Sequence, residues 1–114
     1  MKLSEVIEVL NARVVCGDDM LERDVHFGFA SDMMSDVLTL DTDNMVLITG
    51  LSNLQTIRTA EMADISQIIF VRNKAVTPEM CELARENNMV LLSSSLSMFR
   101  AVGLLYKAGL EPIY

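Results

Sequence analysis

The sequence predicts an α/β domain in which helices cover both faces of a parallel sheet. Three short apolar segments in the second half, residues 45–50, 67–72 and 89–94, are each followed by a polar turn and an amphipathic helix. Their apolar centres are unbroken, which is typical of strands that are buried on both faces. Because the chain has 114 residues, residues 1–114 are expected to form a single domain.

The helices of the second half have recognisable starts. Ser52 and Gln55 have the spacing of a capping box. Thr77 precedes Pro78, and a proline suits the first turn of a helix. The residues expected to be buried recur at helical spacing: Leu54, Ile57 and Ala60 in the first helix, and Met80, Leu83 and Ala84 in the second.

The first half is less regular. Apolar residues at helical spacing predict an opening helix, and residues 13–16 and 25–30 are predicted as strands. Ser31 or Asp32 is expected to cap the next helix. The apolar stripe of that helix consists of Met33, Met34, Val37 and Leu38. We interpret its methionines as core or interface residues.

The last predicted helix, residues 97–108, has almost no polar face. It is expected to begin at Ser95 or Ser97 and to end near Gly109. A helix that is apolar all round is buried on more than one side, and large exposed apolar patches are rare in monomers. We therefore expect a homodimer or larger assembly through this helix; the alternative is a monomer that covers the helix internally.

Composition and charge indicate the classes of partner and location. The net charge is −7 and the nine Lys and Arg residues are scattered singly, which argues against a nucleic-acid partner. A small phosphate-bearing ligand is still compatible with this charge, because such a ligand needs only one or two cations and some backbone amides.

The sequence shows no signal peptide and no run of about 18 apolar residues. Cys16 and Cys81 are predicted to be buried, reduced thiols in a cytoplasmic protein, with one disulfide as the alternative.

Polar residues follow each of the three predicted strands of the second half. In open parallel sheets, ligands bind beyond the carboxyl ends of the strands. The hydroxyl, amide and cationic side chains there suit a phosphate, a carboxylate or a nucleotide. The alternative is that they only cap helices and form turns. The candidate ligand-binding residues are Thr49, Gly50, Ser52, Asn53, Arg72, Asn73, Lys74, Ser93, Ser94 and Ser95.

No complete catalytic motif is present, and we predict no catalytic residue, metal site or cofactor. The five glycines fit neither of the glycine-rich phosphate-binding motifs, and there is no GxSxG motif. His26, the only histidine, is expected to be a partly buried structural residue. The acidic segment at residues 18–24 is expected to be a solvated loop.

The order of these motifs resembles the DRTGG domain family, and the resemblance covers nearly the whole chain. The residues that carry it are Val15 to Asp18 with Leu21, Ala30 to Leu38, Leu47 to Gly50, Ile68 to Lys74 with Pro78, Ser97 to Phe99, and Gly103 to Tyr106.

Two departures concern the residues that give the family its name. The expected Asp-Arg pair is replaced around residues 52–54, and the Thr-Gly-Gly turn is replaced by residues 71–74. The chain therefore resembles the stand-alone branch of the family. Related domains occur in bacterial HPr kinase/phosphorylase, in phosphotransacetylases and between the CBS modules of some pyrophosphatases. The P-loop of the kinase belongs to its other domain, so the resemblance implies no kinase activity here.

The resemblance implies a three-layer α/β/α fold with a mainly parallel sheet, dimer formation and a regulatory role. Our first hypothesis is a non-catalytic ligand-sensing domain, with adenine nucleotides as the first ligand class to test. A structural module that docks a larger metabolic enzyme through helix 97–108 is the alternative. A small enzyme that uses His26 or Asp32 is a third possibility.

Overall fold

The computed structural model describes residues 1–114. The helices are α1 (Leu3–Leu10), α2 (Met34–Val37), α3 (Leu54–Met62), α4 (Pro78–Glu86) and α5 (Met98–Ala108). The strands are β1 (Arg13–Cys16), β2 (Phe27–Ala30), β3 (Met45–Thr49), β4 (Gln67–Phe70), β5 (Val90–Ser93) and β6 (Glu111–Pro112).

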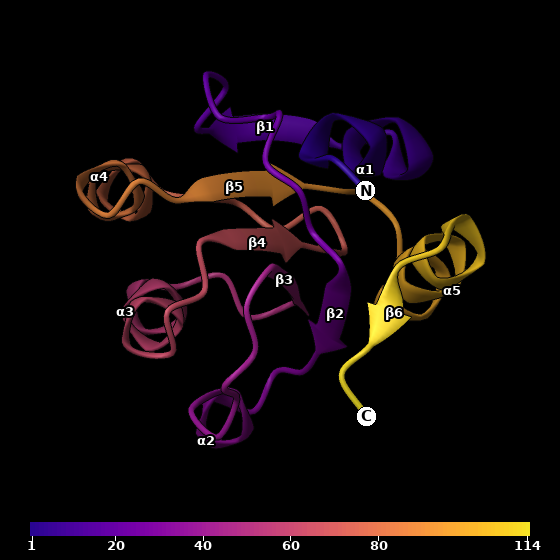
Figure 1. Ribbon diagram of the computed structural model, residues 1–114. Helices are drawn as coiled ribbons and strands as arrows, with labels where there is room; N and C mark the ends of the chain where they lie inside the picture. The colour runs from indigo at the N-terminus through magenta and orange to yellow at the C-terminus, as the bar shows by residue number, and fades with distance from the viewer.

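The six strands form one mainly parallel sheet in the order β1-β5-β4-β3-β2-β6. Only β1 is antiparallel to its neighbour, β5. Strands β2 to β5 are consecutive in the chain and neighbours in the sheet. The crossovers that contain α2, α3 and α4 therefore all advance in the same direction across the sheet. These three helices cover one face of the sheet, and α1 and α5 cover the other (Figure 1). The predicted three-layer α/β/α fold is confirmed.

The unbroken apolar strands supply both faces of the sheet. In β3, Leu47 belongs to the core beneath α2, α3 and α4, whereas Val46 and Ile48 belong to the core beneath α1 and α5. In β4, Ile68 and Ile69 alternate in the same way. Since successive side chains of a strand point to opposite faces, a strand in the middle layer needs apolar residues for both faces. The buried polar residues Thr49, Gln67 and Ser93 lie at the ends of β3, β4 and β5.

The predicted starts of α4 and α5 are confirmed, and the predicted start of α3 is wrong. The side chains of Thr77 and Ser97 accept hydrogen bonds from backbone amides at the starts of α4 and α5, each at 3.2 Å. Helix α3 is capped by Asn53 rather than by a capping box at Ser52. The Ser52 hydroxyl donates instead to the carbonyl oxygen of Ala75, so a bond between two loops replaces the expected local one.

Helix α2 differs most from the prediction. Neither Ser31 nor Asp32 caps it, and its N-cap residue, Met33, makes no side-chain capping bond. Of its apolar stripe, Val37 is buried, whereas Met33 and Leu38 are 61% and 50% exposed; Met33 is therefore not a core residue, and its role at an interface stays a prediction. With only 4 residues, the helix is too short to bury more than one turn.

Helix α5 is packed on one side within the chain. Ala101 and Leu105 are buried against the sheet, whereas Phe99 and Tyr106 are 91% and 68% exposed. The chain therefore does not cover this helix on all sides, and the homodimer stays a prediction. At 11 residues, α5 is the longest helix, and no helix has the length and apolarity needed to cross a bilayer. The cytoplasmic location stays a prediction.

Candidate functional site

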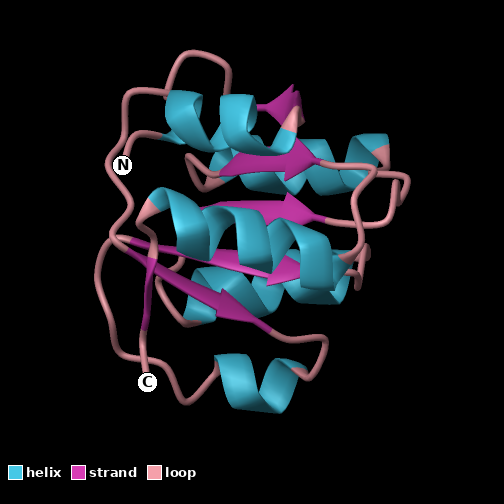
Figure 2. Cartoon of the chain, turned by 90° about the vertical axis from the view of Figure 1, so that its right-hand side faces the viewer, coloured by secondary structure: helices cyan, strands magenta, loops and turns pink.

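The parallel strands deliver their polar ends to one edge of the sheet. Figure 2 shows the arrowheads of the parallel strands pointing to the same side of the molecule. Because β5, β4, β3 and β2 are neighbours in that order, the loops that follow them lie side by side. We call this row of loops, residues 31–32, 49–53, 71–74 and 93–95, the carboxyl rim.

At the end of β3, a buried threonine organises the carboxyl rim. The Thr49 hydroxyl donates to Oδ1 of Asp32 at 2.9 Å, and the Gly50 amide donates to the same oxygen at 2.7 Å. The Leu51 amide in turn donates to the Thr49 hydroxyl at 3.1 Å. Asp32, which follows β2, is thereby fixed against the end of β3.

Asp32 is a rim residue that the sequence analysis did not include among the ligand-binding candidates. It follows the predicted strand 25–30, so the rule used for the later strands would have found it. Asp32 was expected to cap the next helix, or to act in a small enzyme. Its two bonds to β3 are tertiary contacts with no local sequence signal.

At the end of β4, Arg72 and Asn73 both have left-handed backbone conformations, with φ of 63° and 55°. Their amides donate to the carbonyl oxygens of Leu96 and Ser94, at 2.7 and 2.9 Å. Glycine adopts this conformation without steric cost. Here two residues with larger side chains adopt it, and the bonds to the loop after β5 hold them in place.

The cations of the carboxyl rim have no acidic partner. The one ion pair in the structure joins Lys2 to Glu22 at 3.4 Å, on another part of the molecule. Arg72 is exposed and Lys74 is half-buried. Two unpaired positive charges therefore lie at the end of β4, in the middle of the rim.

The serines after β5 divide into structural and exposed residues. Ser93 and Ser94 are buried, and the Ser94 hydroxyl accepts a hydrogen bond from the Leu96 amide at 3.2 Å. Ser95 is exposed. Of the three predicted serines, Ser95 is therefore the one with a hydroxyl open to a ligand.

An open surface pocket of about 660 Å³ lies at the part of the carboxyl rim formed by the loops after β2 and β3. Its lining residues come from the β2–α2 connection and the loop after β3: Ser31, Asp32, Met33, Met34, Ser35 and Leu51. None of the ten predicted ligand-binding residues lines this pocket. They form the open rim next to it.

The two cysteines are buried and free, as predicted. Burial raises the pKa of the Cys16 thiol, and the nearby Cys81 raises this pKa further. A catalytic cysteine needs the opposite change, because the thiolate is the nucleophile.

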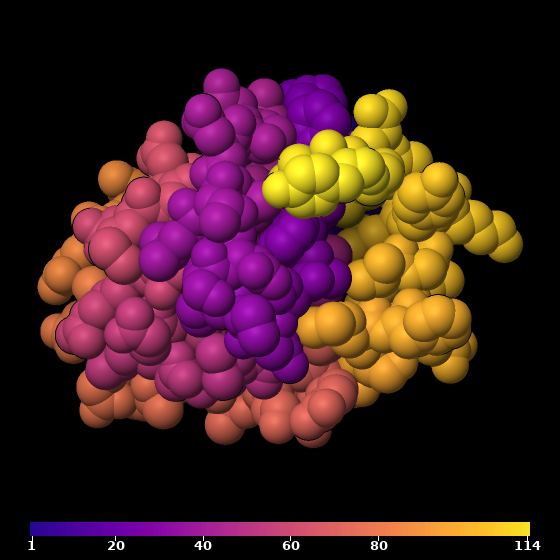
Figure 3. Space-filling model, turned by 90° about the horizontal axis from the view of Figure 1, so that it is seen from below, coloured from indigo at the N-terminus to yellow at the C-terminus, as the bar shows by residue number.

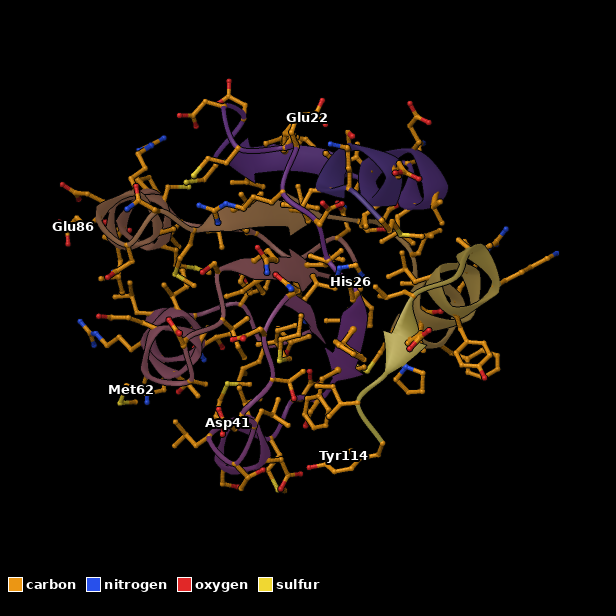
Figure 4. All side chains as sticks on the ribbon, viewed as in Figure 1. Glu22, His26, Asp41, Met62, Glu86 and Tyr114 are labelled. Atoms are coloured by element: carbon orange, nitrogen blue, oxygen red, sulfur yellow. The ribbon has the colours of Figure 1, made fainter.

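His26 does not have the predicted partly buried position, since it is exposed at the start of β2. Figure 4 shows it well apart from the labelled carboxylates Glu22, Asp41 and Glu86. The surface pocket that it lines contains Glu111 but no serine or cysteine. A catalytic triad also needs a nucleophile next to the imidazole. This pocket therefore does not contain a triad.

Comparison with known proteins supports the fold and the family. The family model described as "DRTGG domain" matches residues 5–108. No curated protein matches the chain. A solved structure of the CBS and DRTGG domains from the regulatory region of Clostridium perfringens pyrophosphatase, complexed with the activator diadenosine tetraphosphate, aligns with a TM-score of 0.70 and 15% identity.

That alignment covers 91% of this chain and 45% of the pyrophosphatase chain, so the chain spans less than half the length of that structure. At this identity, the likeness shows a shared fold. The family match covers residues 5–108, from α1 to the end of α5, and therefore includes the whole carboxyl rim. The chain belongs to the DRTGG domain family.

Proposed function

We propose that this chain is a non-catalytic regulatory domain that senses a small anionic ligand at the carboxyl rim, with an adenine nucleotide as the first candidate. The observation that carries the proposal is the pair of unpaired cations, Arg72 and Lys74, among the loops after β3, β4 and β5. Helices α3 and α5 also begin at this edge, and helix N-termini favour negative charge. The nucleotide activator of the pyrophosphatase region supports this choice of ligand class.

We propose a role in this site for each predicted residue from its charge, exposure and hydrogen bonds. Arg72 and Lys74 would neutralise the anion, and the exposed Ser95 hydroxyl would donate to it. Asn53 uses its Oδ1 to cap α3, so its amide group would face the ligand as a donor. The remaining predicted residues would shape the rim through their own bonds: Thr49, Gly50, Ser52, Asn73, Ser93 and Ser94.

Isothermal titration calorimetry with ATP, ADP, AMP and inorganic tripolyphosphate tests this proposal. Saturable binding of at least one of them is expected, and Arg72→Ala should weaken it by about tenfold, because charge-assisted bonds to phosphate are strong. Arg58→Ala is the matched control, since Arg58 is exposed on α3 and lies outside the rim. The proposal is wrong if none of the ligands binds at millimolar concentration, or if both variants behave alike.

The non-catalytic part of the proposal rests on the states of Cys16 and His26 described above. We expect ATP to remain intact during prolonged incubation with the protein and Mg²⁺, as followed by ³¹P NMR. Turnover that is abolished by His26→Ala or Asp32→Asn would instead support a small enzyme.

The outer face of α5 favours a second role, as a protein-protein interface. Phe99 and Tyr106 are exposed one above the other on this face, and a side chain added at Gly103 between them would meet nothing within 4 Å. Figure 3 shows α5 at the outside of the molecule, next to the C-terminal residues. Because an exposed apolar surface of this kind favours association, we propose that two copies form a homodimer through α5.

Light scattering after size-exclusion chromatography tests the homodimer. A dimer is expected for the unchanged chain and a monomer for Phe99→Glu. Met62→Glu is the control, because Met62 is 64% exposed on α3, away from α5. A monomer at all concentrations would contradict the homodimer and favour docking to a larger enzyme.

A further inference from the structure

The carboxylate of Asp32 is held in a fixed orientation with one oxygen unused. Oδ1 accepts hydrogen bonds from the Thr49 hydroxyl and the Gly50 amide, whereas Oδ2 accepts none from the protein. Asp32 is exposed and has no cationic partner. The free oxygen is therefore a preoriented acceptor for a hydrogen-bond donor from outside the chain.

The open pocket around Asp32 has three apolar residues in its lining. Met33 and Met34 line it from the α2 side, and Leu51 lines it from the loop after β3. Thioether side chains adapt their shape and make favourable contacts with aromatic rings. The pocket has a volume of about 660 Å³ and is open to solvent. A planar ring bearing donor groups is the chemistry that this lining suits.

The strand order separates this pocket from the cations by a defined distance. Asp32 follows β2 and Arg72 follows β4, and both strands are neighbours of β3. Adjacent strands lie about 4.8 Å apart, so the two loops are about 10 Å apart. A ribose with a chain of phosphates is of comparable length. The negative charge of Asp32 would also repel phosphate, which orients such a ligand with its phosphates towards Arg72.

We propose that the Asp32 pocket is the subsite for the nucleoside half of a nucleoside polyphosphate. Asp32 accepts a hydrogen bond from a ribose hydroxyl, and Met33, Met34 and Leu51 contact the base. This inference rests on the proposed function, because it requires that the phosphates bind at Arg72 and Lys74. It adds that Asp32 makes the rim select a nucleotide over a bare polyphosphate.

Calorimetry with ATP and inorganic tripolyphosphate, on the full chain and on Asp32→Asn, tests the inference. Asparagine keeps an oxygen for the Thr49 and Gly50 donors, so the loop should stay folded, but it places an amide donor where Oδ2 was. Asp36→Asn is the control, since it removes an exposed carboxylate from α2 that does not line the pocket.

We expect the unchanged chain to bind ATP about tenfold more tightly than tripolyphosphate, and Asp32→Asn to weaken ATP binding by about tenfold. Tripolyphosphate binding should be unchanged or tighter in Asp32→Asn, because a negative charge has been removed. The subsite is refuted if both ligands bind the unchanged chain equally, or if Asp32→Asn weakens ATP binding no more than Asp36→Asn does. If neither ligand binds, the proposed function fails and the subsite fails with it.

Discussion

Replacing Thr49 by valine would remove the hydroxyl that joins the ends of β2 and β3 while keeping the shape of the side chain. Thr49 is fully buried, and its hydroxyl donates to Asp32 at 2.9 Å and accepts from the Leu51 amide at 3.1 Å. Valine suits a buried strand and leaves no cavity. The change in unfolding free energy therefore reports on these two hydrogen bonds.

The expected cost is about 1.5–2 kcal/mol. An ordinary hydrogen bond contributes about 1 kcal/mol net, and a bond to a charged group contributes more. The bond to Asp32 must be discounted, because this carboxylate is exposed and water replaces part of the interaction. For a chain of this length, the cost corresponds to a decrease in Tm of roughly 5–8 °C.

Urea unfolding of Thr49→Val, Asp32→Ala and the double variant measures the coupling between the two residues. We expect a coupling energy of at least about 0.5 kcal/mol, as for residues in direct contact. Thr39→Val is the control, because the Thr39 hydroxyl donates to a backbone carbonyl from an exposed position and should cost less than about 0.5 kcal/mol. Equal effects of Thr49→Val and Thr39→Val, together with additive single variants, would refute the described rim geometry.

Three further predictions concern stability. Gly17→Ala should lower the unfolding free energy by more than about 1 kcal/mol, because φ is +89° and the added carbon would lie 3.0 Å from the Met89 carbonyl oxygen and from the Val90 Cα. Gly103→Ala, with open space around it, should raise the unfolding free energy by about 0.5–1 kcal/mol. Equal urea curves for the two variants would contradict both predictions. Arg72→Gly should raise the unfolding free energy by about 0.5 kcal/mol by relieving the left-handed conformation, and a decrease would contradict this. Because burial raises the pKa of Cys16 in the folded state, the unfolded chain loses this proton first as the pH rises above about 8.5. The resulting stability is therefore complete below that pH and is lost as the pH approaches the folded pKa. Urea unfolding between about pH 8 and 10 should show a smaller loss for Cys16→Ala than for the unchanged chain, and identical losses would contradict the assignment.

The middle strands were predictable because burial on both faces leaves a direct mark on the sequence. Leu47 and Ile48 point to different cores, so β3 is apolar from Met45 to Ile48 and polar only at Thr49, where it ends. The start of α4 was predictable because it depends on neighbouring residues only. Thr77 accepts a hydrogen bond from an amide three residues later, and Pro78 occupies the first position of the helix.

Helix α2 was not predictable in the same way. Ser31 and Asp32 have the residue types of helix caps, but the Asp32 side chain bonds to Thr49, which is 17 residues away. Strand β6 has only 2 residues, Glu111 and Pro112, both exposed. Such a strand forms because the end of α5 places it next to β2. Two residues are too few to show a periodic pattern in the sequence.

The carboxyl rim was predicted from topology rather than from a motif. Once β3, β4 and β5 are parallel neighbours, the loops after them must share an edge. The sequence did not reveal the left-handed turn at Arg72, because positive φ at non-glycine residues depends on bonds to the neighbouring loop. The part of the site that depends on contacts between loops therefore required the structure.

A ¹H–¹⁵N correlation spectrum recorded during titration with ATP tests the proposed ligand site most directly. We predict saturable shifts of the amide signals from the loops after β3, β4 and β5, residues 49–53, 72–74 and 93–95, accompanied by Asp32 and its neighbours. Unchanged spectra at millimolar ATP would contradict the account. Shifts confined to the opposite edge of the sheet, around Asp43, Asp64 and Gln67, would contradict it equally.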